Sequence, residues 1–350
     1  MLRYIKTSLK KTNTLVVACR LCGSVANKHE LITSPNCSET RLLKVAVIGM
    51  PNAGKSTFIN NLMDRKVFAT SAKVHTTRNK AKAIFTEDDA QIIFVDTPGV
   101  VSDREHKKYN LQKTFIRDSK NVSKEADIIG VIHDVTNIWT REKLDIKLIK
   151  LLDMHKRKPS FLVLNKVDAL KSKRKLLDLT RQLTENCING KPIPGGKPMK
   201  KEDVENKGWP FFQEIFMVSS LTGDGLEDVK KFLIDNALPG EWLFPKDIWT
   251  DQEMETIITN AVRATLLDFI PQEIPYSLKP EVEYLNVDNG LITTVVLINC
   301  PSMRITKLVA GASDGKLKQI TEAIQKNLQD AFHNNVRIKI VLISPEKDKK

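Results

Sequence analysis

Short apolar runs that stop at polar or glycine-rich turns recur in the first two thirds of the chain. They cover residues 44–48, 91–95, 161–164 and 214–218. Apolar runs of this length, bounded by turn residues, are typical of buried strands. We therefore predict strands at these positions, each ending where polar candidate binding residues begin.

The last third of the chain has a different pattern. Apolar side chains first repeat at the spacing of one helix face, and Pro271 ends that helix. Further on, Asn289-Gly290 is a hairpin signal between two apolar stretches. The predicted elements are a helix at residues 252–270, strands at 276–285 and 291–300, a helix through residues 317–331, and a strand at 336–343.

Length and composition predict two domains, because 350 residues exceed one average core. We expect a nucleotide-binding domain at residues 41–240, a linker at 241–250 and a smaller domain at 251–345. Residues 190–210 begin with six Gly or Pro in nine positions, which indicates a flexible insertion. No apolar run approaches the length of a membrane span, so we expect no transmembrane segment.

Residues 49–57 read GMPNAGKST and follow the first apolar run directly. This spacing is typical of a phosphate-binding loop, in which backbone N–H groups surround the β-phosphate and Lys55 reaches the β- and γ-oxygens. The Ser56 hydroxyl would bind Mg²⁺. A chance match in a glycine-bearing turn is the alternative, but strand, loop and helix follow in the required order. The residues expected at the phosphates are Asn52, Ala53, Gly54, Lys55, Ser56 and Thr57.

Two further elements would complete the phosphate site. Asp96 ends the second apolar run, where a carboxylate can hold Mg²⁺ through water, and the Gly99 N–H can meet the γ-phosphate. Between the first two runs, Thr77, preferred over Thr76, would bind Mg²⁺ in the GTP state and release it after hydrolysis. Val100 stands where other GTPases carry a water-orienting glutamine, so we expect slow intrinsic hydrolysis.

The third apolar run ends in Asn165, Lys166 and Asp168, a pattern that indicates base recognition. A carboxylate at Asp168 accepts from guanine N1–H and the N2 amine, a donor pair that adenine lacks, so the nucleotide should be GTP. Ser219-Ser220-Leu221 follows the fourth run, and its amides could contact guanine O6.

The motifs GMPNAGKST, KVHTTR, DTPG, NKVD and LDFIPQEIPYS together resemble those of the Era GTPases, and RKVF before KVHTTR is similar to their mitochondrial members. The resemblance covers roughly residues 41–345. It implies a doubly wound α/β P-loop GTPase domain followed by a smaller α+β type II KH domain. It also implies hydrolysis of GTP to GDP, with Lys55, Thr77 and Gly99 as catalytic residues.

The partners implied by the resemblance are mitochondrial small-subunit ribosomal RNA and the pre-ribosomal small subunit. A peripheral contact with the inner-membrane surface is left open. The resemblance also nominates a potassium ion beside the phosphates, held by Asn52, and the alternative is that Asn52 stabilises the loop turn.

The RNA-binding loop expected of a KH domain departs from its pattern here. In Gly-x-x-Gly, the glycines let the RNA backbone approach closely. This chain reads Gly311-Ala312-Ser313-Asp314-Gly315, which puts a carboxylate at the second glycine. Either the loop is shifted by one residue and Gly315 substitutes, or RNA contact is weaker and depends on basic residues near the loop and on the basic GTPase domain. The RNA-binding candidates are Gly311, Ala312, Ser313, Arg304, Lys307, Lys316 and Lys318.

The N-terminal segment, residues 1–40, indicates a mitochondrial transit peptide. Its first 29 residues include Arg3, Lys6 and Arg20 and have no acidic residue. A basic arm that stays attached is the alternative. We expect the mature protein in the mitochondrial matrix.

The net charge of +13 is unevenly distributed. Residues 41–250 carry 37 basic and 27 acidic side chains, whereas residues 251–350 carry 12 and 13. The basic runs are typical of solvated surface, although a surface facing ribosomal RNA would look the same. The weakly acidic C-terminal domain leaves a second function open, namely a GTP-regulated switch whose C-terminal domain docks a protein.

Overall fold

In the computed structural model, the described residues are 40–70, 81–96, 123–193, 207–271 and 273–344. Thr77, Gly99 and the predicted transit peptide lie outside them. Most of the predicted RNA-loop and nucleotide-site residues lie inside them.

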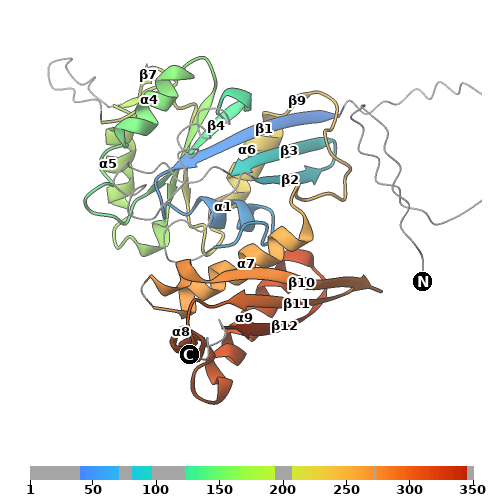
Figure 1. The fold of residues 1–350 in the computed structure, drawn as a ribbon. Coiled ribbons are helices and arrows are strands. Elements are labelled where there is room, and N and C mark those ends of the chain that lie inside the picture. The colour runs from blue at the N-terminus through green and yellow to red at the C-terminus, as the bar shows by residue number, and fades with distance from the viewer. Residues whose placement is uncertain (1–39, 71–80, 97–122, 194–206, 272, 345–350) are drawn as a thin grey trace, which may run out of the picture. The chain divides into compact units, whose positions relative to one another are not determined.

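A central sheet organises the N-terminal domain (Figure 1). Its strands are β1 (Arg41–Gly49), β2 (Ala81–Glu87), β3 (Ala90–Asp96), β4 (Ile128–Asp134), β5 (Ser160–Asn165), β8 (Glu214–Val218) and β9 (Leu238–Pro239). The order is β2-β3-β1-β4-β5-β8; β2 runs antiparallel to β3, and β9 pairs antiparallel with the start of β1. Because β1 is parallel to both β3 and β4, its carboxyl end lies beside theirs.

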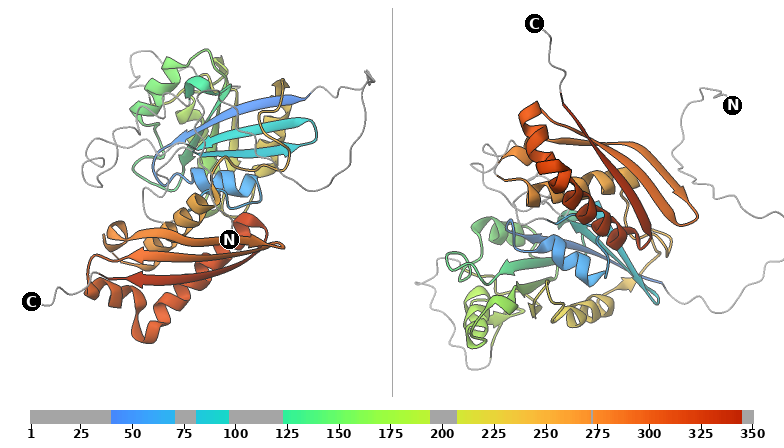
Figure 2. Two further views of the ribbon diagram at one scale, coloured as in Figure 1. Left: turned by 45° about the vertical axis from the view of Figure 1, so that its right-hand side comes forward. Right: turned by 90° about the horizontal axis from the view of Figure 1, so that it is seen from below.

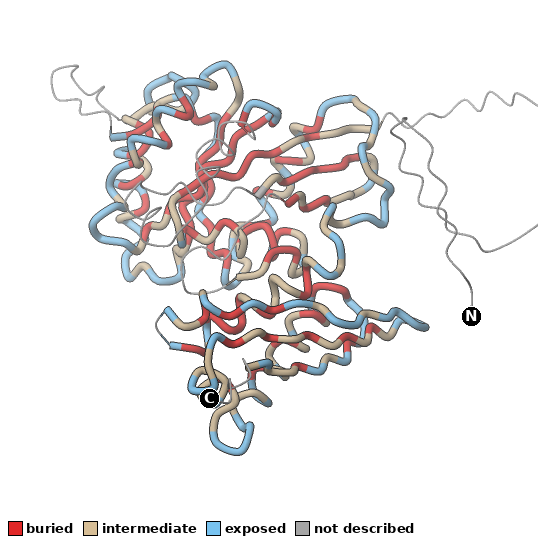
Figure 3. The backbone as a smooth tube through the Cα atoms, in the orientation of Figure 1, coloured by how far each residue is buried: buried red, intermediate tan, exposed pale blue. Residues whose placement is uncertain are grey.

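Helices cover both faces of this sheet. They are α1 (Lys55–Leu62), α4 (Ile146–Met154), α5 (Arg174–Leu183) and α6 (Leu226–Asp235), with a 3-10 turn η1 (Val167–Ala169) after β5. The apolar sides of α1 and α6 pack into one core, and those of α4 and α5 pack into a second core on the other face. Figure 3 shows the strands between these layers as the most buried backbone. The predicted doubly wound α/β class is confirmed.

The C-terminal domain has a three-stranded sheet backed by helices (Figure 2). Its elements are α7 (Met254–Phe269), η3 (Ile274–Ser277), β10 (Lys279–Asp288), β11 (Leu291–Asn299), α8 (Met303–Ala310), η4 (Ala312–Asp314), α9 (Gly315–Phe332) and β12 (Asn335–Ile343). β10 and β11 are antiparallel, whereas β11 and β12 are parallel. Asn289 and Gly290 both have positive φ (48° and 76°), as a tight hairpin turn requires. This element order and sheet confirm the predicted KH-like α+β fold.

The structure corrects one predicted boundary and refines one predicted segment. The strand predicted from residue 276 begins at Lys279, because Pro275 stands in a 3-10 helix that ends at Ser277. The predicted insertion at residues 190–210 has regular structure at its start and a buried residue near its end. Its start, Lys191–Pro192 (β7), pairs with Cys187–Ile188 (β6), and Trp209 near its end is buried.

The stretch predicted as a linker is hydrogen-bonded to the start of β3 in the central sheet. The backbone N–H groups of Leu243 and Phe244 donate to Gln91 Oε1 (3.0 and 3.1 Å), and Trp242 Nε1 donates to the Asp89 carbonyl (3.1 Å). The segment is therefore held along β3.

Across the described residues, none of the helices is both long enough and apolar enough to cross a bilayer.

Candidate functional site

The loop after β1 has the backbone of a phosphate cradle. Gly54 has φ 95° and precedes α1, and Asn52 has φ 59°. A Cβ atom at Gly54 would lie 2.3 Å from Asn165 Nδ2, so a side chain is sterically excluded there. Lys55 is buried, and its Nζ donates to the carbonyl oxygens of Gly49 (3.2 Å) and Met50 (3.1 Å). The loop thus folds around the lysine ammonium, at the N-terminus of a helix that favours anions.

Asn165 connects this loop to the predicted base site. Its side chain is 1% exposed. Nδ2 donates to the Ala53 carbonyl (2.8 Å), and Oδ1 accepts from the Ser220 N–H (3.0 Å). One buried amide therefore joins the phosphate loop, the end of β5 and the loop after β8.

Asp168 and Ser219 meet at the predicted base site. Ser219 Oγ donates to Asp168 Oδ1 (2.6 Å), which fixes the carboxylate. Ser219 Oγ also accepts from the Thr222 N–H (3.2 Å). Asp168 itself is exposed, so its second oxygen can accept hydrogen bonds from a ligand.

Lys166 lies along the phosphate loop. Its Nζ donates to the Asn52 carbonyl (2.7 Å) and forms a salt bridge with Asp134 Oδ2 (2.6 Å). Burial opposes ionisation of Asp134, but hydrogen bonds from Lys166 and Thr136 outweigh it and hold the pKa of Asp134 below its ordinary value. Asp134 was not among the site residues predicted from the sequence. Like Asp96, it is the last residue of a mostly apolar run, and this position could have marked it as a site residue.

The remaining predicted nucleotide residues are placed as follows. Ser56 and Thr57 lie in the first turn of α1, and the backbone of Asp96 pairs with Val47 at the carboxyl end of β3. Leu221 is 78% exposed. Ser220 Oγ is buried without a hydrogen-bond partner among the described residues. Thr77 and Gly99 lie outside the described residues.

The predicted RNA loop joins α8 to α9. Gly311 has φ 77° and ψ −173°, and a Cβ there would lie 2.6 Å from Lys316 Cβ. Ser313 and Asp314 are both left-handed (φ 48° and 57°), whereas Gly315 has an ordinary helical φ of −62° and open space around it. Asp314, not Gly315, therefore occupies a position that favours glycine. This geometry supports the unshifted alignment of the loop.

The basic candidates flank this loop. Arg304 and Lys307 are exposed on α8, Lys318 is exposed near the start of α9, and Lys316 is half-buried there. Ala312 and Ser313 are exposed at the tip.

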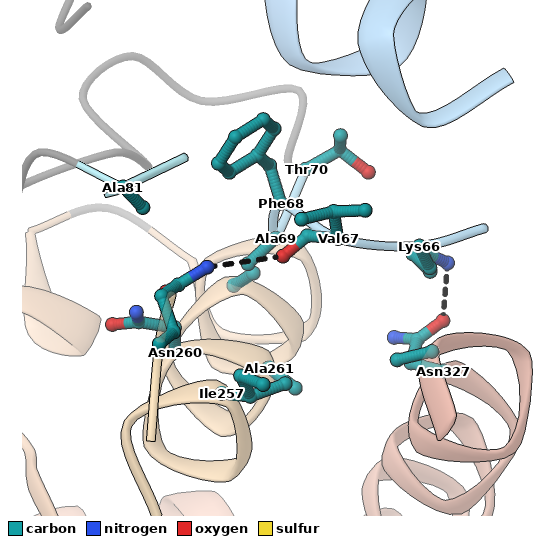
Figure 4. Close-up of a pocket in the computed structure, with 13 residues that line it drawn as sticks. Lys66, Val67, Phe68, Ala69, Thr70, Ala81, Ile257, Asn260, Ala261 and Asn327 are labelled. Atoms are coloured by element: carbon teal, nitrogen blue, oxygen red, sulfur yellow. Dashed lines mark hydrogen bonds between the residues drawn. The ribbon is translucent and has the colours of Figure 1, made fainter. Parts of the chain in front are cut away.

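A small pocket lies where the segment after α1 meets α7 and α9 (Figure 4). Lys66 Nζ donates to Asn327 Oδ1 on α9 (2.5 Å), and burial lowers the pKa of Lys66. Next to Lys66, the Arg65 guanidinium donates to the Ala331 carbonyl (3.2 Å) and lies 4.9 Å from the centre of the Trp249 ring. The chain that leads toward the predicted switch residue Thr77 is therefore attached to the C-terminal domain.

The comparisons with known proteins agree with this geometry. Residues 44–166 match the family described as 50S ribosome-binding GTPase. The mitochondrial GTPase Era of Danio rerio is 36% identical over 344 residues, covering 89% of this chain and 77% of that protein. GTPase Era of Crocosphaera subtropica is 30% identical over 305 residues, covering 86% and 87%.

Two solved structures are similar over nearly their whole length. One is Era in complex with MgGDPNP and nucleotides 1506–1542 of 16S ribosomal RNA (TM-score 0.68, 24% identity, 88% of this chain and 95% of that chain). The other is Aquifex aeolicus Era bound to GDP·AlF4⁻ (TM-score 0.69, 24% identity, with the same coverage). At this identity they show the fold.

The doubly wound domain with its phosphate loop and strand-end motifs defines a P-loop GTPase. Within that class, the chain belongs to the Era GTPase family. The family predicted from the motifs is confirmed.

Proposed function

We propose that this protein is a GTP-binding switch that hydrolyses GTP slowly and binds small-subunit ribosomal RNA through its KH domain during assembly of the mitochondrial small ribosomal subunit. One observation carries the nucleotide part. The buried Asn165 amide joins the phosphate loop to the loop that orients Asp168, so one rigid unit presents both phosphate and base contacts.

GTP fits the described residues by their donor and acceptor chemistry. Asp168 presents a carboxylate already oriented by Ser219, which suits the paired N–H donors of guanine and not adenine. The Ser220 loop adds a buried hydroxyl without a partner among the described residues. Mg²⁺, which neutralises charge on the β- and γ-phosphates when bound, suits the oxygen ligands Ser56, Thr77 and Asp96.

Within the chain, Lys55 would orient the γ-phosphate and stabilise charge that develops on its oxygens. The position of Val100 provides no amide to orient the attacking water, which supports slow intrinsic hydrolysis. Asn52 would hold a potassium ion beside the phosphates. Its left-handed backbone (φ 59°) also suits the simpler alternative, a residue that stabilises the turn.

The attachment of Lys66 and Arg65 to α9 provides a route between the two domains. If GTP binding moves the chain that leads to Thr77, this movement would be transmitted to α9 through these contacts. RNA affinity would then depend on the bound nucleotide.

The cellular setting rests on the relatives. Two similar proteins, from Danio rerio and Salmo salar, bear the name mitochondrial GTPase Era. An Era protein of the same fold is known in complex with nucleotides 1506–1542 of 16S ribosomal RNA. The basic, acid-free first 29 residues support import into the mitochondrial matrix.

The second candidate is a GTP switch whose C-terminal domain docks a protein. The balanced charge of residues 251–350 and the exposed carboxylate of Asp314 at the loop tip favour it. Crosslinking the protein in mitochondria and sequencing the attached RNA separates the two candidates. Recovery of small-subunit ribosomal RNA supports the first, and crosslinks to protein without RNA overturn it.

The nucleotide assignment is tested by Asp168→Asn. The new amide should accept hydrogen bonds from guanine poorly, and it should donate to O2 of xanthine. The ratio of GTP affinity to xanthosine triphosphate affinity should therefore fall by at least about a hundredfold, because two charge-assisted hydrogen bonds to guanine are lost. Asp178→Asn on α5, also an exposed aspartate, is the matched control and should keep GTP affinity. Unchanged GTP affinity in Asp168→Asn would remove this residue from the site.

A further inference from the structure

Positive charge is concentrated in one segment of the GTPase domain. Residues 141–181 carry 13 basic and 5 acidic side chains, a surplus of eight in a chain whose net charge is +13. This segment includes α4, β5 and α5. The KH domain, in contrast, has no surplus of positive charge.

The fold brings these charges to one surface. Helices α4 and α5 both pack their leucines into the same core on one side of the sheet, and they lie beside each other (Figure 1). Their outer sides therefore face solvent together. The exposed cations of this α4–α5 face are Lys143, Lys147, Lys150, Lys156, Arg157, Lys171, Lys173, Arg174 and Arg181.

Part of this charge is neutralised within the protein. Salt bridges in this segment include Arg141 to Glu142 and Lys166 to Asp134, and Lys166 belongs to the nucleotide site. Lys150, Lys173 and Arg174 have no ion-pair partner in the described part of the chain. Exposed cations without local partners attract a polyanion most strongly.

An exposed tryptophan lies in the turn that leads into α4. Trp139 is 88% exposed, in the turn between β4 and α4. Asn137 fixes the turn, because its Oδ1 accepts from the Trp139 N–H (3.1 Å) and its carbonyl accepts from the Arg141 N–H (2.9 Å). A large exposed aromatic ring, a few residues from Lys143 in the chain, can stack on an unpaired base.

We infer that the α4–α5 face is a second RNA-binding surface, in which Lys and Arg side chains contact RNA phosphates and Trp139 stacks on an unpaired base. This inference rests on the proposed function as an RNA-binding protein. In this arrangement, the GTPase domain provides most of the electrostatic attraction for RNA. The KH-domain loop at Gly311 provides the close contact with the RNA backbone. An anionic membrane surface is the competing occupant.

The test uses the full chain and transcribed small-subunit ribosomal RNA. Removing two phosphate contacts with Lys150→Gln plus Arg174→Gln should weaken binding at low salt. The parent protein loses RNA affinity as salt rises from 50 to 200 mM, and this loss should be about sevenfold smaller in the double variant. For single strands, each phosphate contact contributes about −0.7 to the slope of log affinity against log salt concentration, and the variant lacks two contacts. The matched control is Lys231→Gln plus Lys246→Gln, two exposed lysines outside this face, and it should bind like the parent. GTP hydrolysis without RNA should be the same in all three proteins.

Tryptophan fluorescence tests the stacking. The difference spectrum between the parent and Trp139→Phe isolates Trp139, and RNA should quench it. Vesicles of phosphatidylcholine and cardiolipin should leave it unchanged. A blue shift on vesicles without quenching by RNA would show that the face binds membranes and would overturn the inference.

Asp314→Gly in the KH loop separates the two proposals. If it alters RNA affinity while the Lys150/Arg174 variant retains both the parent affinity and the parent salt dependence, the RNA-binding function stands and the α4–α5 face is refuted. If both variants differ from the parent, the face is supported.

Discussion

Replacement of Asn165 by alanine tests whether one buried amide holds the nucleotide site together. The substitution removes hydrogen bonds to the Ala53 carbonyl and from the Ser220 N–H, two groups that are almost wholly buried. A buried polar group left without a partner costs about 1–3 kcal/mol, so the loss of two partners should lower the unfolding free energy of the GTPase domain by roughly 2–6 kcal/mol. For a domain of about 200 residues, a 3 kcal/mol loss corresponds to a Tm lower by roughly 6–12 °C.

GTP affinity should fall along with stability, because the phosphate loop loses its attachment to the base site. Thermal unfolding followed by circular dichroism, together with titration of fluorescent GTP, measures both effects. The control is Asn334→Ala, an exposed asparagine without a side-chain hydrogen bond in the described residues, and it should change stability by less than about 0.5 kcal/mol. A Tm within 2 °C of the parent, with unchanged GTP affinity in Asn165→Ala, would refute the role of this amide.

Three further predictions follow from single positions. Asp314→Gly should raise affinity for single-stranded ribosomal RNA about fivefold at low salt and less at high salt. Asp314→Asn should raise it too if the charge is the cause. Equal titration curves for the parent and both variants would exclude contact between RNA and this loop. Hydrolysis of GTP should be faster in potassium than in sodium, and Asn52→Ala should lose that difference; equal parent rates in both salts would leave Asn52 as a turn residue. Asp134 has a lowered pKa in the folded state, so its contribution to stability is present at neutral pH and is lost as pH falls below about 4. Asp134→Asn should therefore be less stable than the parent at pH 7 and should lose less stability on acidification, and parallel pH profiles from urea unfolding would contradict this.

The sequence by itself determined the nucleotide motifs and the family. Lys55 and Asp168 stand at spacings that phosphate and guanine contacts require, and such spacings are local properties of a strand end and the turn that follows it. The periodicity of the last third of the chain likewise determined the KH-like order of helices and strands, because side-chain period follows directly from backbone geometry.

The tertiary structure decided which of these pieces contact one another. Lys166 and Asp134 are 32 residues apart, and Asn165 and Ala53 are 112 apart; they meet because β1, β4 and β5 are parallel neighbours whose carboxyl ends share one edge. Strand order depends on the packing of whole helices and strands, so local pattern cannot reveal such pairs. The same holds for Asp314, whose left-handed backbone comes from the way α8 turns into α9, and for the basic surface that α4 and α5 form together.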